Sequence, residues 1–141
     1  MAAENLAQNL TDLGHTATTL MAAQTRLEDL AAADVCVLAS PSWDHLGQEG
    51  VPHEDFIMLM QQLENAQLPQ KPMAVLALGD SSYTVFCGAA AHLQKFILKI
   101  GAREVLPPLK IDHYYGDEKL AQQQILTWAK ELSTALAQQT A

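Results

Sequence analysis

Two short polar segments, each with one large aromatic residue, are the parts of this 141-residue sequence best suited to chemistry. Residues 79–88 read Gly-Asp-Ser-Ser-Tyr-Thr-Val-Phe-Cys-Gly, and residues 40–47 read Ser-Pro-Ser-Trp-Asp-His-Leu-Gly. Each segment follows an unbroken apolar run, 73–78 and 35–39 respectively, which is typical of a strand buried on both faces. Ligands of open parallel sheets bind at such strand ends, and two neighbouring aromatics can hold a flat ring between them.

The apolar periodicity along the chain predicts helices that alternate with strands. The expected helices are 6–13, 26–33, 53–67, 86–100 and 121–136, and the expected strands are 16–21, 34–39, 71–78 and 103–111. The pair Pro107-Pro108 confines the last strand to an edge or a bulge, because proline has no N–H to donate. Strands separated by helices indicate one α/β domain over residues 1–141, with a parallel sheet and helices on both faces.

The two polar segments resemble the flavin-binding loops of flavodoxins, and residues 79–88 are close to that family's signature. The resemblance covers residue 4 to about residue 136. It implies a flavodoxin-like doubly wound sheet and a non-covalent FMN whose isoalloxazine ring lies between Trp43 and Tyr83. The cofactor-binding residues that it implies are Ser40, Pro41, Ser42, Trp43, Asp44, Gly47, Gly79, Asp80, Tyr83, Phe86 and Cys87.

The implied function is that of an electron carrier that shuttles electrons between redox enzymes and has no substrate of its own. The five histidines are scattered without the spacing of metal ligands. Ser42 and Ser81 have no activating base at a recognisable spacing, so nothing points to nucleophilic catalysis. One departure from the family is Asp44, which stands where many members have glycine.

The expected order opens with a helix, whereas flavodoxins open with a strand and a phosphate-binding loop of the type S/T-x-T-G-N-T. Neither precedes Leu6 in this sequence. In the family's strand order, 2-1-3-4-5, the absent first strand is central, so we expect a gap between the strands at 16–21 and 34–39. The remaining strands close up, another chain supplies the strand, or the sequence is a truncated form. We favour truncation, because residues 2–6 resemble the middle of a helix.

The net charge of −8 lies entirely within residues 27–70, which contain eight acidic residues and no lysine or arginine. This asymmetry argues against nucleic acid or an anionic membrane as a partner and favours redox proteins with a basic face. A solvated acidic face explains it equally well. We expect a monomer unless another chain supplies the missing strand. Two cysteines form no disulfide framework, and the first residues lack a signal-peptide pattern, so we expect a cytoplasmic protein.

Two other functions stay open at this point. The first is a truncated or flavin-free interaction module with the flavodoxin fold, which retains the sheet but holds no cofactor. The second is a flavin enzyme such as a quinone reductase, a family that has different loops and a substrate pocket for which the sequence gives no sign. The visible colour of the purified chain separates the carrier from the flavin-free module.

Overall fold

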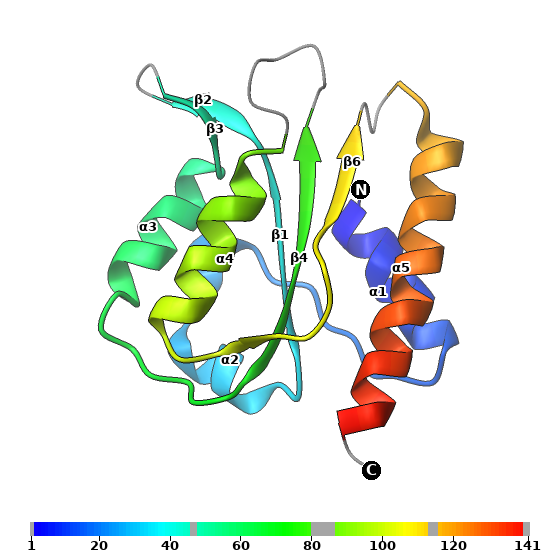
Figure 1. Cartoon of the computed structure of the whole chain (residues 1–141), viewed down its shortest axis with the longest axis horizontal. Helices are drawn as coiled ribbons and strands as arrows, with labels where there is room; N and C mark the ends of the chain where they lie inside the picture. The colour runs from blue at the N-terminus through cyan, green and yellow to red at the C-terminus, as the bar shows by residue number, and fades with distance from the viewer. Residues whose placement is uncertain (1, 46–47, 80–86, 113–115, 140–141) are drawn as a thin grey trace.

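The computed structural model describes residues 2–45, 48–79, 87–112 and 116–139. In chain order the elements are α1 (Ala2–Asp12), the 3-10 helix η1 (Ala22–Gln24), α2 (Leu27–Ala32), β1 (Cys36–Pro41), β2 (Trp43–His45), β3 (Gln48–Val51), α3 (Glu54–Gln62), β4 (Pro72–Gly79), α4 (Ala89–Lys99), β5 (Arg103–Glu104), β6 (Leu109–Asp112) and α5 (Glu118–Gln139). The predicted alternation of helices with parallel strands is confirmed (Figure 1).

Strand β4 is the centre of the parallel sheet. On one side it pairs with β1 in a continuous register that runs from Cys36 opposite Met73 to Pro41 opposite Leu78. On the other side it pairs with β5 near its start and with β6 near its end. All three pairings are parallel, so the carboxyl ends of β1, β4 and β6 lie at the same edge of the sheet (Figure 1).

Helices cover both faces of the sheet, and β4 divides its side chains between them. Met73, Val75 and Ala77 belong to the apolar cluster beneath α2, α3 and α4. Ala74 and Leu76 belong to the cluster beneath α1 and α5. This alternation follows from the two-residue period of a strand. None of these five residues is exposed, which explains why this stretch of sequence is apolar without interruption.

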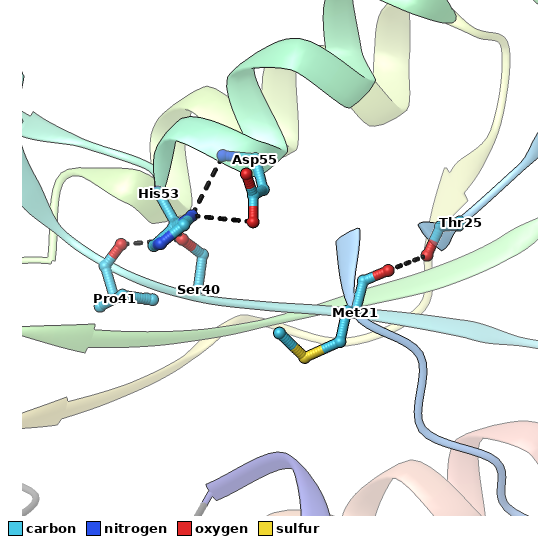
Figure 2. Close-up of polar contacts among 6 residues, drawn as sticks. All are labelled: Met21, Thr25, Ser40, Pro41, His53 and Asp55. Atoms are coloured by element: carbon cyan, nitrogen blue, oxygen red, sulfur yellow. Dashed lines mark hydrogen bonds and ion pairs between the residues drawn. The ribbon is translucent and has the colours of Figure 1, made fainter. Parts of the chain in front are cut away.

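The prediction of a strand at residues 16–21 is wrong. These residues form neither helix nor strand, and Leu20 and Met21 are exposed by 53% and 66%. The segment ends at η1, where the Thr25 hydroxyl donates to the Met21 carbonyl at 2.8 Å (Figure 2). Residues with high strand propensity favour an extended backbone, but a strand also needs a neighbouring strand to pair with. Within the described part of the chain, β1 has a strand neighbour on its β4 side only.

Two further segments differ in detail from the expectation. The first polar segment begins within β1 and continues into β2, which pairs antiparallel with β3, with Trp43 opposite Val51. The single strand expected at 103–111 is divided into β5 and β6. The interruption contains the two prolines, which lack the N–H that a ladder requires. Among the described strands, β5 and β6 pair only with β4, which places them at an edge of the sheet.

Neighbouring residues of α4 offer a direct test of this packing. Ile97 is fully buried in the cluster beneath the sheet, whereas Leu98 is 74% exposed. Ile97→Ala should lower the free energy of unfolding by about 2–5 kcal/mol, because it leaves a cavity in the core. Leu98→Ala should change it by less than about 0.5 kcal/mol. Urea unfolding of the two variants measures both values, and equal losses would show that α4 is rotated about its axis.

Candidate functional site

The candidate site lies at the carboxyl edge of the sheet, where the chain leaves β1 and β4 (Figure 1). The two strand ends are held together beyond their ladder, because the N–H of Ser42 donates to the carbonyl of Leu78 at 2.8 Å. Ser42 is the residue between β1 and β2, and Leu78 is the penultimate residue of β4. The first polar segment is therefore attached to the strand from which the second one departs.

The hydroxyl of Ser42 makes a second connection, to the start of α4. Its Oγ accepts a hydrogen bond from the N–H of Ala89 at 3.1 Å. The first N–H groups of a helix have no partner within the helix. Gly88, at the N-cap position of α4, has no side chain that could accept from them. The cap of α4 is thus supplied by a residue that lies 47 positions earlier in the chain.

The hydroxyl of Ser40 plays the matching part at the start of α3. Ser40 is 3% exposed, and its Oγ accepts from the N–H of His53 at 2.9 Å and donates to the carbonyl of Pro41 at 2.8 Å. His53 then caps α3 itself, because its Nδ1 accepts from the N–H of Asp55 at 3.0 Å (Figure 2). The two serines that flank Pro41 therefore fasten the end of β1 to two different helices.

Gly79 and Cys87, near the two ends of the second polar segment, lie in direct contact. A Cβ atom at residue 79 would lie 2.9 Å from the backbone nitrogen of Cys87 and 2.8 Å from its Sγ. Such distances are too short for a carbon atom, so residue 79 has to be glycine. Cys87 itself has a φ of +49°, a left-handed conformation that is uncommon for residues with a side chain.

The Cys87 thiol is enclosed between the ends of two strands. It is 1% exposed, and its Sγ lies 3.7 Å from the carbonyl oxygen of Ala77 and 3.8 Å from that of Ile111. Burial raises the pKa of this thiol to about 11, while the positive charge of Lys110 opposes the increase. Burial also raises the pKa of Cys36, the other free cysteine. Both groups are thiols at neutral pH, and this protonation state suits packing rather than nucleophilic chemistry.

The structure brings together five of the residues that the sequence assigned to the site. Those placed at the sheet edge are Ser40, Pro41, Ser42, Gly79 and Cys87. Trp43 and Asp44 lie in β2, and the directions of their side chains are outside the described part of the structure. The remaining four, Gly47, Asp80, Tyr83 and Phe86, lie outside the described residues altogether.

Sequence reasoning missed the two residues that complete the frame of this edge, His53 and Ala89. Each of them is bound to a serine hydroxyl through its backbone N–H, and a pattern of side chains does not record such a contact. The available signal was Gly88, which leaves the start of the next helix without a side-chain acceptor and so requires one from elsewhere.

Other kinds of site find no support in the described residues. They contain no group of three or more histidine, cysteine or acidic side chains that could hold a metal ion. The helices among them are too short or too polar to cross a lipid bilayer. Neither polar segment contains a lysine or an arginine, so their sequences suit an uncharged flat group better than an anion.

A parallel sheet with helices on both faces defines the class of doubly wound α/β domains. The sequence model of one protein family, described as Flavodoxin, matches residues 1–128. A flavodoxin of Nitratidesulfovibrio vulgaris is 31% identical over 136 residues, which are 95% of this chain and 88% of that protein. The chain therefore belongs to the flavodoxin family.

Solved structures agree with this assignment at the level of the fold. A flavodoxin of Streptococcus pneumoniae superposes with a TM-score of 0.80 at 22% identity, over 94% of this chain and 88% of that one. A Fusobacterium nucleatum flavodoxin, solved with flavin mononucleotide bound, gives a TM-score of 0.77 at 15% identity, again over 94% and 88%. These similarities show that this chain has the flavodoxin-like fold.

The raised pKa of Cys87 predicts how stability depends on pH. The thiol ionises near pH 9 in the unfolded chain but near 11 in the folded one, so the unfolded state binds fewer protons between these values. The contribution of Cys87 is therefore complete below pH 9 and is lost as the pH rises to about 11. Urea unfolding at pH 8 and pH 10 should show a smaller loss of stability in Cys87→Ala than in the wild type. Identical losses of stability in the variant and the wild type would show that burial does not raise the pKa of the Cys87 thiol.

Proposed function

We propose that this chain is an electron carrier that binds FMN non-covalently at the carboxyl edge of its sheet. The observation that carries the proposal is the fastening of both polar segments at this edge, in a chain that belongs to the flavodoxin family. The F. nucleatum flavodoxin, which has the same fold, is a protein with bound flavin mononucleotide. Bound FMN supplies the capacity to take up and release electrons, and the chain has to orient the ring.

The residues present fit the ring portion of this cofactor. Gly79 carries no side chain at the point where β4 ends, and the backbone of Cys87 lies against it. We assign to the backbone around Asp80 and Cys87 the hydrogen bonds to the pyrimidine edge of the ring. We assign the stacking on the ring to Trp43 and Tyr83, which would contribute about 0.5–1.5 kcal/mol beyond burial.

In our proposal, the hydroxyls of Ser40 and Ser42 act on the site indirectly, through hydrogen bonds to the chain. The Oγ atoms of Ser40 and Ser42 already accept hydrogen bonds from the chain, so we assign both residues to the shape of the site. Pro41, Asp44, Gly47 and Phe86 complete the set of proposed neighbours of the ring. Asp44 lies in the extended strand β2, without the positive φ that glycine would permit.

The residues proposed to bind the ring of FMN do not include a binding site for its phosphate. The 141 residues contain no loop of the type S/T-x-T-G-N-T. The outer edge of β1 has no strand beside it in the described ranges, and β1 carries no charged residue that would protect such an edge. We propose that a first strand and its phosphate loop are what this edge lacks, so that the given residues hold the ring but not the phosphate.

We assign the partners from charge. The acidic residues of segment 27–70 include Glu54 and Asp55. Both lie in the first turn of α3, which the hydroxyl of Ser40 connects to the end of β1. A redox protein with a basic face is attracted to such a surface, and the attraction weakens as salt is added. We propose a monomeric, cytoplasmic carrier rather than an enzyme. A flavin-free interaction module is the second candidate, favoured by the lack of the phosphate loop in the sequence.

A comparison of FMN with riboflavin, which lacks the phosphate, tests the proposed cofactor. In the absence of a phosphate loop, FMN loses about four hydrogen bonds to its charged phosphate, or roughly 6–12 kcal/mol. FMN then has no advantage over riboflavin, and both should bind this chain with affinities within about tenfold of each other. Quenching of flavin fluorescence measures both dissociation constants. A sub-micromolar value for FMN would show that another group holds the phosphate, and the absence of binding by either ligand would favour the flavin-free module.

The stacking proposal is tested by a pair of substitutions. Tyr83→Ala should weaken riboflavin binding by roughly two- to tenfold, the loss expected for one aromatic stacking contact. His45→Ala is the control, because His45 is close in sequence to Trp43 but is not assigned to the ring. Fluorescence titration of the two variants gives the comparison. Equal effects would show that the assignment of the aromatic residues is wrong.

A further inference from the structure

We infer that Ser42 is a positioning residue for the flavin ring, because it sets the separation between the two ring-binding segments. The inference rests on the proposed function and extends it to a residue that need not touch the cofactor. Its basis is that one side chain and one N–H connect three elements at the carboxyl edge: the end of β1, the end of β4 and the start of α4.

The two bonds of Ser42 bracket the second polar segment. Its N–H binds the carbonyl of Leu78, immediately before residues 79–88, and its Oγ binds the N–H of Ala89, immediately after them. Both ends of that segment are therefore fixed to the same residue. Because Trp43 is the next residue along the chain, its backbone is fixed to the same point. The distance between the two segments thus depends on Ser42.

The N-cap residue of α4 offers no side-chain acceptor that could replace Ser42 as the partner of the Ala89 N–H. Ala89 is fully buried, and the N-cap residue of α4 is Gly88. An alanine at residue 42 would leave a buried N–H without its partner, which is costly in the interior of a protein. The start of α4 would have to move to reach another acceptor, and the Gly79–Cys87 contact would move with it.

Two other serines show why the effect should be specific to residue 42. Ser40 lies in the same segment, but its hydroxyl binds the start of α3 and leaves α4 untouched. Ser133 makes a tertiary bond of similar length, 2.8 Å to Nε2 of His15, on α5. Ser133→Ala therefore removes a comparable hydroxyl from a place that the site does not involve, and it serves as the matched control.

Riboflavin is the appropriate probe, because it carries the ring without the phosphate. Ser42→Ala should weaken riboflavin binding by up to about thirtyfold, because binding would have to order a helix start that has lost its cap. Ser42→Thr keeps the hydroxyl and should bind within about threefold of the wild type. The visible circular dichroism of bound riboflavin should change in Ser42→Ala and stay the same in Ser42→Thr. Ser133→Ala should retain wild-type affinity and dichroism.

Three results would overturn the inference. Wild-type affinity and dichroism in Ser42→Ala would show that the cap does not position the ring, as would a loss in Ser42→Thr as large as in Ser42→Ala. A similar loss in Ser133→Ala would show a general effect of stability. Should Ser42→Ala fail to fold, Ser42→Cys takes its place with the same expected direction, because a thiol is a weak acceptor. Absence of riboflavin binding by the wild type would instead refute the proposed function, and this inference with it.

Discussion

Burial of β4 on both faces is the constraint on which the rest of this structure depends. Residues 73–77 have no exposed surface, so helices have to cover the sheet on each side of this strand. Removing that much apolar surface from water is the main source of stability, at roughly 25 cal/mol per Å². Because β4 cannot shift without exposing apolar side chains, its carboxyl end at Gly79 is a fixed point for the site.

The candidate site is built outward from this fixed point by a small number of polar contacts. Ser42 attaches the neighbouring segment to the end of β4, and Cys87 packs against Gly79. The start of α4 is capped by the hydroxyl of Ser42, whereas α3 is capped by its own N-cap residue His53, whose N–H is bound by the hydroxyl of Ser40. The first N–H groups of a helix need acceptors, and Ser42 supplies one to α4, whose N-cap residue is a glycine.

A serine or cysteine in such a segment can either contact a ligand or hold the chain itself in place. The resemblance to flavodoxins implies that Ser40 and Ser42 bind the cofactor. In the structure, Ser40 and Ser42 accept hydrogen bonds from backbone N–H groups of the chain itself. The buried thiol of Cys87 likewise faces the carbonyls of Ala77 and Ile111, so that only its backbone is suited to meet a ligand.

The sequence by itself determined the class of fold, because the period of apolar residues records which faces of each helix and strand are buried. The alternation of helices and parallel strands, the buried run of β4 and the edge position of the segment around Pro107 and Pro108 all follow from local patterns. The pairing of segments far apart in the chain was decided only by the tertiary structure. Residues 16–21 have the composition of a strand but pair with none of the described strands, and the cap of α4 comes from Ser42. Such contacts depend on which groups the packed core brings within hydrogen-bond distance, and no local pattern of residues records that.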